Sequence, residues 1–192
     1  MNDTYKIVKD FIPVDRSLHL SEKFKNYCKR KMVDGDPQVP NAPAVYNYLY
    51  FLELLCEKTL QLSEVYGEPL FPTYSYARVY GNGDSLFAHT DRESCDVSVT
   101  VNLDCDLVWP IYIHNKNGDT IECLLGPGDA MVYKGKEALH WRDEFLGEEC
   151  VQVFLHYVRS RGPYKNEYFD KQRLTEQVKC GFIGLQDLDE DV

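Results

Sequence analysis

Three side chains that prefer the same kind of metal stand far apart in the sequence. His89 and Asp91 lie in LFAHTDRES, and His140 lies in EALHWRD. In an extended segment residues i and i+2 project to one side, so His89 and Asp91 can reach a single ion. Two histidines and one carboxylate on one face of an octahedron leave three positions open, which suits iron(II) that must also bind exchangeable ligands.

A His-x-Asp tripeptide is weak evidence by itself, and the interpretation depends on its surroundings. A tyrosine-rich run and a glycine-rich turn precede it, and a valine-rich run, a second turn and a lone histidine follow it. Two alternatives stay open. Asp91 can cap a turn beside a surface His89, and His156 can replace His140 as the third ligand, although we favour a pocket-lining or core position for His156.

The elements that must position these residues change in character along the chain. Residues 5–14 suggest a first strand, a helix capped by Asp15 or Ser17 runs to about Met32, and a second helical pattern spans 44–66 and ends at Gly67. After Pro72 short β-rich runs follow one another: 74–80, 96–103, 109–115, 120–125, 129–135 and 150–158. This order predicts a mostly β fold with flanking helices, namely a double-stranded β-helix (a cupin-like jelly roll) with the N-terminal helices packed on one sheet.

The run DVSVTVNLD alternates between apolar and polar residues. Its valines and Leu103 point one way, and Ser98, Thr100 and Asn102 point the other. Either the polar face meets water, or the apolar face packs on the helices while the polar face lines a cavity inside the barrel.

Length and composition indicate one domain over residues 1–192, which has 44% hydrophobic and 27% charged residues. We expect an N-terminal strand and supporting helices in 1–70, a jelly-roll catalytic core in 71–160, and a C-terminal helix with an acidic tail in 161–192. The net charge of −10 argues against nucleic-acid binding. Without a long apolar run or a signal peptide we expect a cytoplasmic protein that does not contact membranes. Seven scattered cysteines predict reduced thiols.

Together these motifs resemble the prolyl-4-hydroxylase-like branch of the 2-oxoglutarate- and iron(II)-dependent dioxygenases, over residues 74–158. Tyr80-Gly81 and LFAHTD are similar to the tyrosine, turn and His-x-Asp of that family, GPGDAMVY to its hairpin, and VQVFLHYV to its last core strand. The resemblance implies metal ligands His89, Asp91 and His140. It also implies that 2-oxoglutarate is decarboxylated to succinate and carbon dioxide while a substrate is hydroxylated by dioxygen, with ascorbate as a candidate reductant.

One position departs from the family pattern. The family carries a lysine or arginine about ten residues after the distal histidine, which pairs with the far carboxylate of 2-oxoglutarate, but Cys150 stands there in this chain. A buried dicarboxylate needs a cationic or multi-donor partner. Arg78 is the preferred substitute because it shares a strand face with Tyr80, the residue similar to the family's donor to 2-oxoglutarate. Further donors to this cofactor are expected from Asn102, Gln152 and His156.

The expected function is hydroxylation of a C–H bond of a prolyl residue, an amino acid or a small metabolite, so the partner is a peptide or a small-molecule substrate together with dioxygen. Two alternatives stay open. One is a cupin-like iron oxygenase that does not use 2-oxoglutarate, and the other is a non-catalytic jelly roll that binds a metal or ligand.

Overall fold

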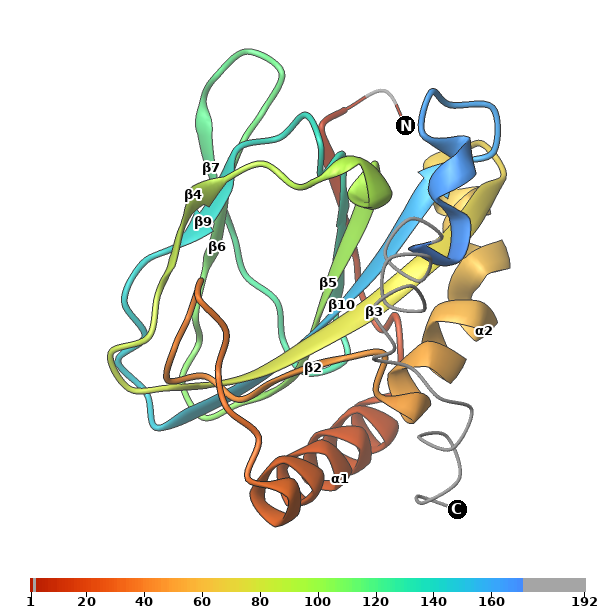
Figure 1. Cartoon of the computed structure of the whole chain (residues 1–192). Coiled ribbons are helices and arrows are strands. Elements are labelled where there is room, and N and C mark those ends of the chain that lie inside the picture. The colour runs from red at the N-terminus through yellow and green to blue at the C-terminus, as the bar shows by residue number, and fades with distance from the viewer. Residues whose placement is uncertain (2, 171–192) are drawn as a thin grey trace.

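Two antiparallel β-sheets face each other in the computed structural model, which describes residues 1 and 3–170 (Figure 1). One sheet has six strands in the order β1-β8-β5-β10-β3-β2, and the other has four in the order β4-β9-β6-β7. The strands are β1 (Tyr5–Val8), β2 (Ala44–Tyr46), β3 (Leu70–Gly81), β4 (Leu86–His89), β5 (Val97–Cys105), β6 (Ile111–His114), β7 (Thr120–Cys123), β8 (Ala130–Tyr133), β9 (His140–Arg142) and β10 (Glu149–Arg159). This is the mostly β jelly roll that the sequence predicts.

Two long helices, α1 (Val14–Lys31) and α2 (Leu49–Tyr66), cover the outer face of the six-stranded sheet (Figure 1). The buried residues of the two helices and the apolar face of β5 form one core cluster. This cluster includes Phe24 and Phe51 from the helices and Val99 and Val101 from β5. The polar residues of β5, Ser98 and Thr100 among them, therefore face the other sheet and are also buried. Of the two arrangements left open for this strand, the one with a polar face inside the barrel is correct.

The N-terminal elements differ in detail from the prediction. The first strand ends at Val8 because Asp10 adopts a left-handed conformation with φ of 50°. Helix α1 begins after Pro13 without a side-chain cap, so neither Asp15 nor Ser17 caps it. The hydroxyl of Ser17 instead donates to the carbonyl of Leu103, 2.8 Å away, which joins the helix to β5.

The second helix is shorter than its sequence pattern. Residues Ala44–Tyr46 form β2, which pairs with β3 at the edge of the larger sheet, and α2 begins only at Leu49. The predicted end at Gly67 is confirmed, since this glycine takes the left-handed conformation with φ of 88°. Two short 3-10 helices, η1 (Glu93–Cys95) and η2 (Lys165–Asp170), complete the secondary structure of the described residues.

Two cysteines contradict the prediction of reduced thiols throughout. Cys105 of β5 and Cys150 of β10 are direct partners in the strand pairing and form a disulfide. Because they are 45 residues apart, no local spacing marked them as a pair. The remaining cysteines within the described residues, Cys28, Cys56, Cys95 and Cys123, are free.

The C-terminal prediction is only partly covered by the described residues. A turn and η2 occupy residues 160–170, where a loop and a short helix are expected, and the acidic tail lies outside the described residues. Within the described part of the chain, none of the helices combines the length and the apolar character that a bilayer crossing requires.

Candidate metal centre and its pocket

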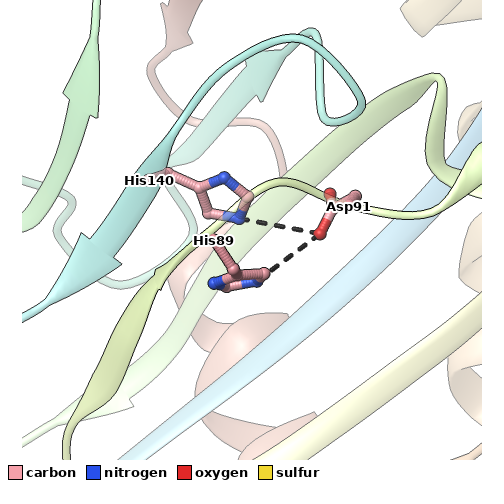
Figure 2. Close-up of side chains that lie close together, drawn as sticks. All are labelled: His89, Asp91 and His140. Carbon is pink, nitrogen blue, oxygen red and sulfur yellow. Dashed lines mark ion pairs between the residues drawn. The ribbon is translucent and has the colours of Figure 1, made fainter.

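Strands β4 and β9 bring the three predicted metal ligands together. His89 ends β4, His140 begins β9, and the two residues are paired partners in the smaller sheet. Asp91 follows β4 by two residues, and its Oδ1 lies 3.6 Å from Nε2 of His89 and 3.7 Å from Nε2 of His140. Figure 2 shows this single carboxylate oxygen facing both rings. The three ligand atoms lie within 4.8 Å of one another, a spacing that one metal ion can bridge.

Backbone carbonyls orient both imidazoles. Nδ1 of His89 lies 2.8 Å from the carbonyl oxygen of Phe87, and Nδ1 of His140 lies 2.9 Å from that of Ala138. An N–H at Nδ1 donates to each carbonyl, so the lone pair of each Nε2 is directed towards Asp91. Such outer hydrogen bonds fix the tautomer and ring orientation of metal-binding histidines.

Asp91 is held by the loop that precedes the distal histidine and by β5. Its backbone N–H donates to the carbonyl of Gly135 over 2.9 Å, and its Oδ2 accepts a 2.6 Å hydrogen bond from Ser98. A Cβ at Gly135 would collide with Ser98, with Oδ2 of Asp91 and with the carbonyl of Cys95. Only glycine therefore allows the loop to approach the carboxylate this closely.

The charge states of these groups suit metal binding. Burial opposes ionisation of Asp91, but the proximity of the His89 and His140 imidazoles holds the pKa of its carboxyl well below the usual range. Burial also lowers the pKa of His140, although Asp91 partly offsets the effect. An ionised carboxylate beside a neutral imidazole is the combination that a divalent ion requires.

A second group of possible ligands shares Asp91. It consists of Asp91, Cys95 and His156. Burial raises the pKa of the Cys95 thiol, which disfavours the thiolate form that binds metals. Nδ1 of His156 lies 3.0 Å from the Ser98 hydroxyl. The geometry therefore favours His140 over His156 as the third ligand, and His156 lines the pocket beside the site.

A pocket of about 300 Å³ opens onto the three ligands. Its apolar lining comes from Leu86, Ile111 and Phe154, and its polar lining, apart from the metal-binding residues, comes from Asp36, Gln38, Tyr74, Tyr76, Arg78, Tyr133 and His156. Of the five residues predicted to contact 2-oxoglutarate, Arg78 and His156 line this pocket. The other three, Tyr80, Asn102 and Gln152, are buried outside its lining. His114 ends β6 and borders a different pocket, so the structure keeps it apart from the site.

Arg78, the expected carboxylate anchor, already has an anionic partner. Its Nη2 donates to Oδ2 of Asp36 and, over 2.7 Å, to Oε1 of Gln38. Its Nη1 lies 3.3 Å from the hydroxyl of Tyr80. Burial is the largest single influence and lowers the pKa of the guanidinium, but Tyr80 and then Asp36 outweigh it, so the pKa is raised overall.

For a second arginine, Arg142, the sequence left open a place at the pocket mouth or a packing or surface position, and the structure buries it. Arg142 stands two residues after His140 on β9, on the same strand face, and is 2% exposed. Its Nη1 donates to the carbonyl of Trp109 over 2.8 Å, and its Nη2 donates to Oε1 of Gln152 over 3.2 Å. No carboxylate of the described residues pairs with it, and its Nε has no hydrogen-bond partner. Burial lowers the pKa of this guanidinium to about 10.

Arg142 lies close to the metal-binding pocket. Leu86, its partner in the pairing of β4 with β9, lines the pocket. Tyr133 also lines it, with its hydroxyl 3.3 Å from Nε2 of His140. Burial raises the pKa of Tyr133, the charge of Asp91 raises it further, and Arg142 opposes the shift. The phenol is therefore within electrostatic reach of both the carboxylate and the guanidinium.

Two other predicted donors, Asn102 and Gln152, are buried and bonded to other groups of the protein. The side-chain amide of Asn102 donates to the carbonyl of Leu125, and Oδ1 of Asn102 accepts from Nε2 of Gln152 over 3.1 Å. Nε2 of Gln152 also contacts the sulfur of Cys150. These two amides bond to each other, and Gln152 also accepts a hydrogen bond from Arg142, so both amides are engaged within the protein.

Comparison with solved structures identifies the fold of this chain. No family model and no curated protein sequence matches the chain. A prolyl-4-hydroxylase from Pseudomonas putida matches in structure with a TM-score of 0.67 and 14% identity, over 84% of this chain and 95% of that one. EctD from S. alaskensis with 2-oxoglutarate and 5-hydroxyectoine matches with a TM-score of 0.63 and 13% identity, over 82% and 72%. A prolyl hydroxylase from Trichoplax adhaerens with a hypoxia inducible factor peptide matches with a TM-score of 0.65 and 10% identity, over 82% and 84%. The double-stranded β-helix is thereby confirmed.

Proposed function

We propose that this protein is an iron(II)- and 2-oxoglutarate-dependent oxygenase that hydroxylates a C–H bond. The observation that carries the proposal is the convergence of Nε2 of His89, Nε2 of His140 and Oδ1 of Asp91 within 4.8 Å, at the edge of a pocket. Two imidazoles and a carboxylate suit iron(II) and leave coordination positions for other ligands. The fold shared with 2-oxoglutarate-binding proteins supports the same conclusion by analogy.

Arg142 is the feature that supports 2-oxoglutarate as the co-substrate. A buried guanidinium without a carboxylate partner is costly unless a ligand supplies the anion. Two residues along a strand span roughly 6.6 Å, which is comparable with the length of a five-carbon dicarboxylate. We therefore infer that Arg142 takes the role first expected of Arg78. It binds the far carboxylate of 2-oxoglutarate, while the oxoacid end faces His89, Asp91 and His140.

Iron(II), when bound, supplies activation of dioxygen coupled to the decarboxylation of 2-oxoglutarate. One oxygen atom enters succinate and the other becomes the hydroxyl of the product, and carbon dioxide leaves. The chain's own residues hold the reactants. His89, Asp91 and His140 bind the ion, and Arg142, which is oriented by Gln152, binds the co-substrate. Leu86, Ile111 and Phe154 exclude water from the reacting atoms.

An anaerobic titration tests the proposal. Addition of 2-oxoglutarate to the iron(II)-loaded protein is expected to produce a weak visible charge-transfer band, and admission of air is expected to produce succinate. A protein that binds iron(II) but gives neither signal would support the alternative of a cupin-like oxygenase without 2-oxoglutarate. A protein that binds no iron would support a non-catalytic jelly roll.

A further inference from the structure

Arg78 belongs to the lining of the pocket, whereas Arg142 lies behind that lining, and the proposed function gives Arg78 no task. If Arg142 binds 2-oxoglutarate, then Arg78 remains in the lining of the same pocket as His89 and Asp91. We propose that Arg78 binds a carboxylate group of the substrate, which takes the place of Asp36, so that the substrate is a small organic acid. This inference rests on the proposed function for the assignment of Arg142.

The hydrogen bonds of Arg78 point to a missing ligand. The side chain is 3% exposed, yet its Nε has no partner. Only three buried side-chain atoms of the described residues lack a hydrogen-bond partner, and two of them are Nε of Arg78 and Nε of Arg142. Buried donors are rarely left unpaired in folded proteins. An acceptor oxygen from a bound molecule would satisfy the Nε of Arg78, as the far carboxylate of 2-oxoglutarate would satisfy that of Arg142.

Asp36 is suited to give way to such an acceptor. Its side chain is 26% exposed, against 3% for Arg78, so water can solvate the carboxylate of Asp36 when it leaves the guanidinium. It lies in the segment between α1 and β2, drawn in orange in Figure 1. Two buried residues of that segment, Val39 and Ala42, attach it to the barrel. The carboxylate of Asp36 also accepts hydrogen bonds from the Tyr76 hydroxyl and from the backbone N–H groups of Gln38 and Val39, so water must replace these contacts when the side chain turns towards solvent.

Charge balance explains why the replacement must be an anion. Removing one partner of a buried ion pair is strongly destabilising, because the other charge is left uncompensated. A neutral ligand that displaced Asp36 would leave Arg78 in that state, whereas a carboxylate restores the pair. The pocket volume of about 300 Å³ is at the lower end for ligand sites. The space suits a molecule of about the size of an amino acid better than a large one.

Calorimetric titration of the protein without iron or 2-oxoglutarate tests the inference separately from the proposed function. The probes are propionate, isovalerate, benzoate and the standard L-amino acids, each compared with its own carboxamide. At least one acid is expected to bind 10-fold or more tightly than its amide. Arg78→Gln is expected to abolish that difference, and Arg142→Gln and the exposed control Arg161→Gln are expected to retain it.

A second variant keeps the test decisive if Arg78→Gln folds poorly. Asp36→Asn removes the competing carboxylate, so the preferred simple acid is expected to bind several-fold more tightly than to the wild-type protein. The inference is overturned if no acid in the panel is preferred over its amide, or if Asp36→Asn weakens binding of that acid. It is also overturned if Arg78→Gln, but not Arg142→Gln, abolishes the iron–2-oxoglutarate band, since Arg78 would then be the co-substrate anchor. If the wild-type protein binds the acid but shows no iron–2-oxoglutarate charge-transfer band, the result contradicts the proposed function and leaves the inference about Arg78 standing.

Discussion

Arg142 of β9 donates a hydrogen bond of 3.2 Å from Nη2 to Oε1 of Gln152 on β10. The contact therefore joins β9, which carries His140, to β10. On β10, Cys150 occupies the position where the resemblance in sequence leads us to expect a cationic anchor for 2-oxoglutarate. The guanidinium thus comes from a strand of the opposite sheet, and an amide two residues beyond Cys150 fixes its orientation. A basic group is therefore present near the position where the sequence alone shows only a cysteine.

We predict that Arg142→Gln weakens 2-oxoglutarate binding by about 30- to 1,000-fold. Loss of a buried, charge-assisted contact costs roughly 2–4 kcal/mol, which corresponds to that range. Titration of the anaerobic charge-transfer band measures the effect. Arg161→Gln removes an equal charge from an exposed position and should leave the titration unchanged. Unaltered binding in Arg142→Gln would remove this residue from the co-substrate site.

Substitution of the predicted ligands should separate them from the other histidines. We expect His89→Ala and Asp91→Ala to weaken iron(II) binding by more than about 100-fold, because each removes a direct ligand. Metal content after anaerobic loading and gel filtration provides the measurement.

Two further histidines are matched controls for that experiment. His114 lies at the end of β6 beside another pocket, and Nδ1 of His156 contacts Ser98. His114→Ala and His156→Gln should both retain iron. Iron loss in His156→Gln together with retention in His140→Ala would show that His156 is the third ligand.

The ion pair between Asp36 and Arg78 predicts a stability that depends on pH. Burial raises the pKa of Asp36, but hydrogen bonds from Tyr76 and Arg78 outweigh it and hold the pKa below its usual value. A depressed pKa in the folded state stabilises the protein above the unfolded value of about 4. That contribution is lost as the pH falls through the folded-state pKa.

Urea denaturation at several pH values tests this linkage. Near pH 7 we expect Asp36→Asn to lower the free energy of unfolding by about 1–3 kcal/mol, since it weakens a charged hydrogen bond to a buried partner. The difference from the wild-type protein should shrink below about pH 4. A difference that stays constant down to pH 2.5 would contradict the assignment.

The packing of α2 on the larger sheet gives a prediction about stability alone. Phe51 is fully buried in the core cluster with α1 and β5, whereas Leu60 on the same helix is 79% exposed. Phe51→Ala should lower the free energy of unfolding by about 3–5 kcal/mol because it leaves a cavity. Leu60→Ala should change it by less than about 0.5 kcal/mol. Equal effects in thermal and urea denaturation would show that α2 does not pack as described.

Several features of the site were predictable because they depend on local spacing. His89 and Asp91 are two residues apart in an extended segment, which places both side chains on one side in any fold. The alternation along β5 likewise separates a polar face from an apolar face, although two environments for the polar face stayed open. The strand runs after Pro72 also indicated the jelly roll, because their lengths and turns are typical of that architecture.

Strand β9 shows why Arg142 was not predicted to bind 2-oxoglutarate. The strand has three residues, His140–Arg142, which is too short for a recognisable alternation of apolar and polar positions. Because β9 was not recognised in the sequence, there was no reason to expect the side chains of Arg142 and His140 on the same strand face. The sequence signal that could have indicated this is the spacing of two residues between a suspected metal ligand and an arginine.

The amino-acid sequence by itself determined the chemistry available to this protein: two histidines, a carboxylate and several arginines, with spacings that place neighbours on common faces. Only the tertiary structure decided which of these meet. Strand pairing brings His140 opposite His89 and joins Cys105 to Cys150. Within residues 1 and 3–170 it also leaves Arg142 without a carboxylate, while Arg78 pairs with Asp36. The physical reason is that contacts between distant residues depend on strand order and register, which are set by burial of the whole apolar core rather than by any local pattern.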